Sequence, residues 1–125
     1  MFAQINGSTV GPFTSGGISY TKTTVTAGSS STLSAAAYAL VYFDPASLLA
    51  TYTLTAPASP ADGDVIEIIA GGTIVASTTV VTTFAFAANG GQSLLQTITP
   101  VTLKGGDRVR YQYNSAQTKW HREIL

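Results

Sequence analysis

The side chains best suited to chemistry are few, and the sequence has a single histidine. His121 stands beside Trp120 near the end of the chain. A general base of the triad type needs a second group that holds its ring, and one histidine allows at most one such site. A strand that packs Trp120 inward and turns His121 outward explains the pair more simply. We therefore expect no catalytic site here.

The closest group of acidic residues is Asp62, Asp64 and Glu67. A calcium site usually gathers six or more oxygens, so the Asp-Gly-Asp run is better explained as a turn with Gly63 at positive φ. A glycan hydrolase would need two carboxylates about 5 to 10 Å apart, and the carboxylates of this chain fall mostly in expected turns. The glycine pairs lack the lysine and the helix of a phosphate-binding loop. We predict a protein that is not an enzyme and holds no metal or cofactor.

Aromatic side chains are the one enriched functional type, and they can stack on sugars or on bases. The interpretation we favour is that they fill a core or a subunit interface. Single-stranded nucleic acid would also require a basic groove, and few cations are available for one, so we expect no nucleic-acid partner. The aromatic residues are Tyr38, Tyr42, Tyr52, Tyr111, Tyr113 and Trp120, and the cations are Arg108, Arg110, Lys119 and Arg122.

Composition points to one β-rich domain. The 125 residues include no cysteine, only 10% are charged, and 31 are serine or threonine, whose short hydroxylated side chains suit exposed strands. The net charge of zero argues against partners recruited by bulk charge, such as duplex nucleic acid or an anionic membrane. No segment resembles a signal peptide or a membrane helix, so we expect a soluble product made in the cytoplasm.

The turn residues recur at the spacing of an all-β domain. We predict an antiparallel β-sandwich or a jelly-roll-like barrel over residues 37–125. Residues 1–36, rich in Gly, Ser and Thr, are expected to form an extended N-terminal arm that is ordered by a neighbour or by the domain itself. The predicted strands are 37–43, 51–56, 64–70, 73–79, 82–88, 93–103, 108–113 and 119–124.

Two of these strands differ in their side-chain pattern. In 108–113, apolar residues such as Tyr111 alternate with polar residues such as Arg110, so one face of the strand is apolar and the other is polar. In 64–70, apolar residues occupy both faces, as in a strand that is covered on both sides. A three-fold interface or a packed arm of the same chain would each provide the second cover. The apolar residues of 64–70 are Val65, Ile66, Ile68 and Ile69.

A series of short motifs follows in a fixed order along the second half of the chain: TYTLTAP at 51–57, PADGD at 60–64, ANGGQ at 88–92, KGGD at 104–107 and SAQTKWHR at 115–122. In this order the motifs resemble a family of small β-domains from tailed-bacteriophage virions, which serve as capsid decoration proteins, head fibres and tail-fibre tips. The resemblance covers roughly residue 51 to the end. One departure is Ala56, where the family often has a leucine before the proline.

The resemblance implies a homotrimer packed through edge strands and N-terminal arms. Because the chain is a short arm plus one domain, we expect a capsid decoration (cement) protein on the virion surface, bound to the major capsid protein. The alternative is a head-fibre or tail-fibre domain that recognises host carbohydrate. The expected interface residues are Val65, Ile66, Ile68, Ile69, Tyr111, Tyr113, Arg108, Arg110 and Trp120.

Overall fold

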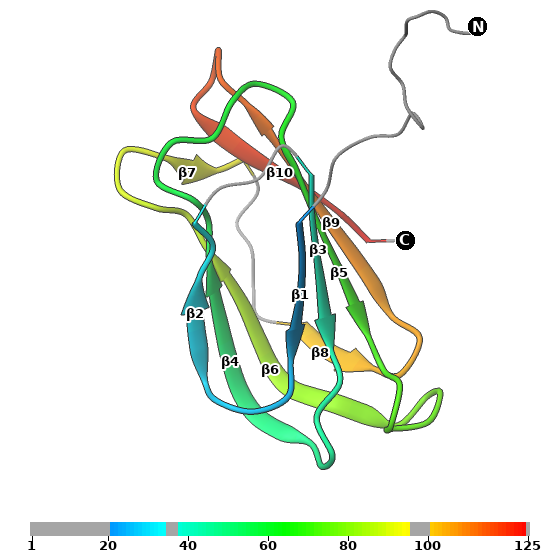
Figure 1. Ribbon diagram of the computed structural model, residues 1–125. Coiled ribbons are helices and arrows are strands. Elements are labelled where there is room, and N and C mark those ends of the chain that lie inside the picture. The colour runs from blue at the N-terminus through cyan, green and yellow to red at the C-terminus, as the bar shows by residue number, and fades with distance from the viewer. Residues whose placement is uncertain (1–20, 35–37, 96–100, 125) are drawn as a thin grey trace, which may run out of the picture.

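The computed structural model describes residues 21–34, 38–95 and 101–124, and this part of the chain contains strands but no helix (Figure 1). The protein is therefore all-β, as the sequence predicts. A six-stranded sheet has the order β1 (Thr21–Val25), β3 (Tyr38–Phe43), β5 (Val65–Ala70), β9 (Arg108–Asn114), β10 (Lys119–Ile124) and β7 (Ser93–Leu94). A four-stranded sheet has the order β2 (Ser30–Thr32), β4 (Leu49–Thr55), β6 (Thr79–Ala87) and β8 (Val101–Lys104).

The sheets are mixed, which corrects the expected antiparallel arrangement. From β1 to β6 the chain alternates between the two sheets, so β1, β3 and β5 are parallel neighbours and so are β2, β4 and β6. Each reversal of the chain leads to the opposite sheet, and the next strand in the first sheet then runs in the original direction. Antiparallel pairing joins β9 to β5 and to β10, and β8 to β6.

The core lies between the two sheets and is rich in aromatic rings. Phe43 of the six-stranded sheet meets the edge of Tyr52 of the four-stranded sheet, with ring centroids 4.9 Å apart. Phe86 stacks on Tyr111 at 3.9 Å and contacts Trp120 edge to face. Contacts of this kind favour a single arrangement of the two sheets, because aromatic pairs prefer definite geometries.

Most strands lie where the sequence predicts them, and three regions differ. The expected strand 93–103 is not a single strand, because its described parts belong to β7 in the six-stranded sheet and to β8 in the four-stranded sheet. Residues 73–79, expected as a strand, belong mainly to an irregular connection, and β6 begins only at Thr79. Part of the expected arm belongs to the β-domain instead, because it contributes β1 and β2, one to each sheet. Residues 1–20, 35 and 36 of that arm, and residues 96–100 within the expected strand 93–103, lie outside the described residues.

Gly63 has the positive φ that the sequence predicts, and Gly71, Gly91 and Gly106 have positive φ as well, the region that glycine enters without steric penalty. Each of the four lies in a connection between the two sheets and not in a hairpin. The turn between β9 and β10 joins neighbouring strands of one sheet, and there Thr118 has a φ of 53°.

Candidate interaction face

The outer surface of the six-stranded sheet has the composition of a binding surface, and we call its β3, β5 and β9 part the outer face. Cross-strand register places its residues in three rows. These rows are Tyr38, Val65 and Gln112, then Leu40, Glu67 and Arg110, then Tyr42, Ile69 and Arg108. Alternation along each strand sends these side chains away from the core.

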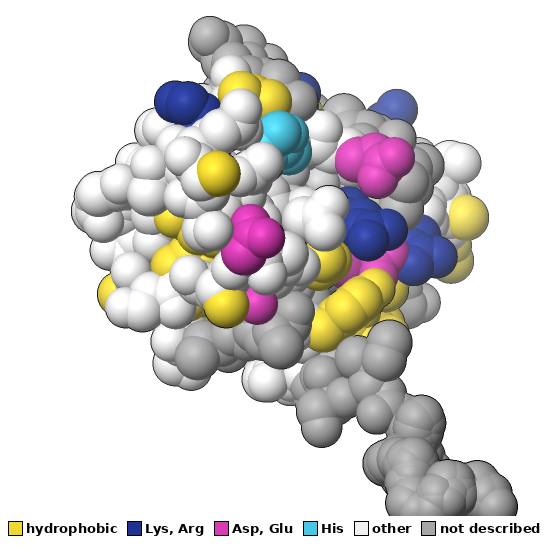
Figure 2. All heavy atoms as spheres, turned by 90° about the horizontal axis from the view of Figure 1, so that it is seen from above, with side chains coloured by type: hydrophobic (Ala, Val, Ile, Leu, Met, Phe, Trp, Pro, Cys, Tyr) yellow, Lys and Arg dark blue, Asp and Glu magenta, His cyan; other side chains and the backbone are white. Residues whose placement is uncertain are grey.

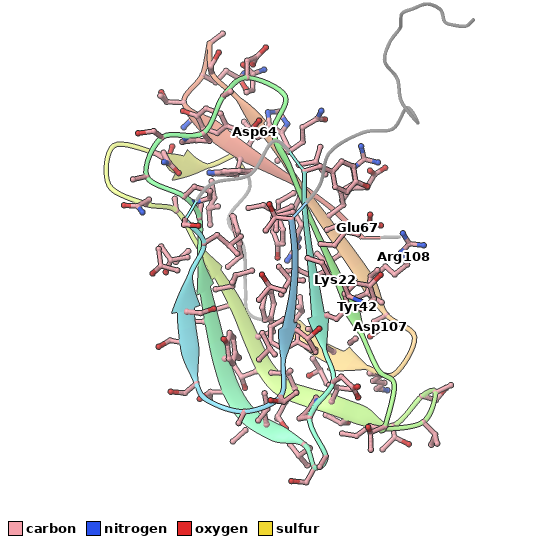
Figure 3. The ribbon with its side chains drawn as sticks, viewed as in Figure 1. Lys22, Tyr42, Asp64, Glu67, Asp107 and Arg108 are labelled. Atoms are coloured by element: carbon pink, nitrogen blue, oxygen red, sulfur yellow. The ribbon has the colours of Figure 1, made fainter. Side chains whose placement is uncertain are left out.

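Glu67 is the centre of this face. Its carboxylate accepts a hydrogen bond from the Tyr38 hydroxyl at 2.8 Å and forms an ion pair with Arg108. Only 4% of Glu67 is exposed, although it points away from the core. Farther along the face, the Lys22 ammonium lies 5.0 Å from the centre of the Tyr42 ring. Figure 3 labels Lys22, Tyr42, Glu67 and Arg108 along the six-stranded sheet.

The surroundings keep Glu67 ionised. Burial alone raises the pKa of this carboxyl, but hydrogen bonds from Tyr38 and Arg108 and the charges of Arg108 and Arg110 outweigh that effect, so its pKa lies below the usual value. The hydrogen bond to Glu67 also raises the pKa of Tyr38. Arg108 of the same chain thus balances the charge of the carboxylate. Half of the Arg108 side chain is nevertheless exposed.

The outer surface of the other sheet is chemically different. Its outward residues on β4 and β6 are Thr51, Thr53, Thr55, Thr83, Ala85 and Ala87. It carries no aromatic or charged side chain among these positions. Aromatic residues and arginine are enriched in protein interfaces, whereas alanine is depleted. In Figure 2, dark-blue cations adjoin yellow hydrophobic side chains on one side of the molecule.

The structure divides the predicted interface residues into two groups. Ile69, Arg108 and Arg110 lie on the outer face and are at least partly exposed, and Val65 lies there but is 5% exposed. The others point into the core of a single chain, because they alternate with the outer residues on β5, β9 and β10. This burial removes them from the expected interface; they are Ile66, Ile68, Tyr111, Tyr113 and Trp120.

The expected interface residues leave out part of the outer face and the lysine beside it: Tyr38, Leu40, Tyr42, Glu67 and Gln112 of the outer face, and Lys22 of the adjoining strand β1. Leu40 is half-buried between two tyrosines on β3, and Lys22 reaches Tyr42 from β1. Strict alternation in Tyr38–Phe43 was the available signal for Leu40. Nothing local identified Lys22, because its place depends on the parallel pairing of β1 with β3.

The acidic residues ahead of β5 stabilise turns. Asp64 accepts a hydrogen bond from the Ala61 amide at 2.8 Å, and Asp62 accepts one from the Ser115 amide at 2.9 Å. With Glu67 bound to Arg108, these carboxylates act separately. Within the described residues, no group of three or more potential ligands could hold a metal ion. No helix there is long and apolar enough to span a membrane.

The motifs behind the family resemblance meet through hydrogen bonds at one end of the molecule. The indole of Trp120 donates to Gln92 Oε1 at 2.8 Å, and Gln92 Nε2 donates to the carbonyl of Pro57 at 2.8 Å. Asn89 Nδ2 donates to the carbonyl of Ala56 at 3.0 Å. Three motifs distant in sequence thus form one hydrogen-bonded cluster, and their side chains serve the fold.

A polar pocket lies at this same end, between the turn before β5 and the β9–β10 hairpin. It has a volume of about 300 Å³ and is lined by Asp62, Gly63, Gln112, Tyr113, Asn114 and His121. The His121 ring is held by a hydrogen bond between Nε2 and the Gln117 side chain at 3.1 Å. Figure 2 views this end and shows histidine and acidic side chains at its surface.

Comparison with known proteins adds little. No family model matches the chain, and no curated protein matches it. Among solved structures, a chain from a "Structure of a chaperone-substrate complex" is similar, with 21% sequence identity and a TM-score of 0.49. The match covers 81% of this chain and 18% of that one, so this chain spans less than a fifth of its length. A likeness of this strength carries no argument about function.

Proposed function

We propose that this chain is a non-enzymatic structural protein of a tailed-phage virion, a decoration protein that binds the head surface as a homotrimer. The outer face is the observation that carries the proposal. Leu40, Tyr42 and Ile69 are partly exposed there beside Arg108 and Arg110. A surface of this composition, next to a threonine-rich surface on the other sheet, favours one defined side for protein contact.

The proposed partner across the outer face is a second copy of the chain. Arg110 and the exposed half of Arg108, with Lys22 on the adjoining strand β1, give this side of the sheet a positive character. Asp62 at the turn before β5 supplies an exposed acidic group for the neighbouring copy. Charges at the rim of an interface set orientation more than affinity. Cyclic closure prevents unlimited head-to-tail growth, and the family resemblance implies three copies.

The finer fold class that we propose is a two-layer sandwich rather than a jelly roll. The aromatic contacts of the core join residues of facing sheets, such as Phe43 with Phe84 and Phe86 with Tyr111. A jelly roll is built from antiparallel Greek keys, whereas β1, β3 and β5 run parallel. The parallel winding favours the sandwich.

The physical role follows from mass action. A trimer that contacts several copies of the major capsid protein binds the assembled shell and not its free subunits, so each binding event shifts the equilibrium toward the shell. No reaction is required, and the location is the outer surface of the virion after synthesis in the host cytoplasm. The competing function, recognition of host carbohydrate by a fibre domain, is favoured by the polar pocket described above.

Density for this chain on intact particles tests the proposal. We expect many copies spread over the head in groups of three, with the outer face buried between copies. A few copies confined to the tail would contradict decoration and favour the receptor-binding function. Particles that lack the chain altogether would contradict both functions.

A further inference from the structure

The polar pocket is a site whose walls are fixed before any ligand arrives. The Gly63 amide donates to the Tyr113 carbonyl at 2.9 Å, and the Ser115 amide donates to Asp62 at 2.9 Å. These bonds join the turn before β5 to the β9–β10 hairpin. With His121 held by Gln117, the groups on both walls are in place, and such preorganisation lowers the entropic penalty of binding.

We propose that this pocket binds one ring of a neutral saccharide. Its side chains include two amides, an imidazole and a carboxylate, belonging to Gln112, Asn114, His121 and Asp62. Sugar hydroxyls both donate and accept hydrogen bonds, and this mixture offers both roles. Tyr113 also borders the pocket, but its side chain is 5% exposed and packs on Trp120 in the core.

The lining argues against anions and metal ions. It contains neither lysine nor arginine, the side chains that usually neutralise a phosphate or a sulfate. A single carboxylate is too few for a calcium ion, which takes six to eight oxygens. A volume of about 300 Å³ is at the lower end for small-molecule sites, and the site therefore suits one sugar ring, with the rest of a longer glycan in solvent.

This site does not use the tyrosine and tryptophan rings that the sequence analysis considered for stacking on sugars. Trp120 and Tyr111 are inside the core, at 0% and 1% exposure, so they are not available to stack on a sugar. Gln112 and His121 occupy outward positions at one end of the six-stranded sheet. Gln112 also belongs to the outer face, so a trimer that closes through that face would reach one wall of the pocket.

The test is an amide-shift titration of the full chain, by two-dimensional NMR, with methyl glycosides of glucose, galactose and N-acetylglucosamine. We expect saturable shifts centred on Gly63, Asn114 and His121 with at least one of them. Gln112→Ala and His121→Ala should each weaken that binding about fivefold to tenfold, the effect of losing one hydrogen bond. Thr83→Ala, on the far sheet, is the matched control and should leave binding unchanged.

Three outcomes would overturn the inference. The first is an absence of saturable shifts with every glycoside. The second is binding that both pocket variants leave unchanged while their spectra remain well dispersed, which would place the sugar elsewhere. The third is tighter binding of glucuronate than of methyl glucoside, which would show that the pocket prefers an anion.

Discussion

At the residue scale, Glu67 links the stability of the domain to pH. Its pKa in the folded chain is below the ordinary value, so the ionised carboxylate stabilises the fold at every pH above the unfolded pKa of about 4.3. This contribution is lost as the pH falls from there through the folded pKa. Because Arg108 is half exposed and solvent weakens its charge, we assign about 1–2 kcal/mol to the contribution at neutral pH.

Replacing Glu67 with glutamine tests this assignment. We expect the wild type to exceed Glu67→Gln in unfolding free energy at pH 7, and the difference to shrink as the pH falls below about 4. Urea unfolding measured from pH 7 to pH 2.5 gives both curves. Glu123→Gln, an exposed position on β10, is the control. A difference that stays constant or grows in acid would refute the role of Glu67.

At the element scale, the irregular connection between β5 and β6 is locked against the turn between β8 and β9. A Cβ atom at Gly105 would lie 2.3 Å from the Val75 carbonyl oxygen, and the Gly105 amide donates to the Thr78 carbonyl at 2.8 Å. Backbone atoms on both sides leave little room for adjustment. The KGGD motif is therefore needed for a close approach of two backbone segments.

Gly105→Ala should destabilise the domain by about 1–3 kcal/mol because the added methyl overpacks this contact. Gly90→Ala is the matched control: a Cβ there meets nothing within 4 Å, so we expect a change within about 0.5 kcal/mol. Thermal and urea unfolding of the two variants give the comparison. Equal stability of both variants would show that the Val75 contact can relax.

The local features of the strands were predictable, and their partners were not. Alternation in Arg108–Asn114 and glycine at the turns report backbone geometry within a few residues, and both predictions are confirmed. A turn residue shows that the chain reverses but not which sheet receives the next strand. For this reason the parallel pairing of β3 with β5 was missed, and the hydrogen bond from Trp120 to Gln92 was equally invisible in the sequence.

The site was predictable to the same extent. Apolar residues on both faces of Val65–Ala70 indicated that both faces of this strand are covered. In the structure the core covers one face, and Tyr38 and Arg108 cover part of the other through their contacts with Glu67. The sequence alone did not show which face of this strand packs against the other sheet. Ile68 and Ile69 were therefore both predicted as interface residues, although only Ile69 is on the outer face. Separating them requires knowing which sheet lies opposite.

At the scale of the whole molecule, the central claim is that identical chains associate in threes through the outer face. The claim joins the apolar and arginine-bearing surface of β3, β5 and β9 to the number of copies implied by the family resemblance. The opposite sheet, with threonine at its outward positions, should remain exposed. Variants on the two surfaces should therefore differ in their effect on assembly while both keep the domain folded.

Light scattering of the purified chain at low micromolar concentration tests this most directly. We expect a mass about three times the 12.9 kDa of one chain. Ile69→Asp and Tyr42→Ser, both on the outer face, should lower the mass to that of a monomer with an unchanged β-rich circular dichroism spectrum, whereas Thr83→Asp should remain a trimer. A monomeric wild type, or a trimer that withstands both outer-face variants, would contradict the account.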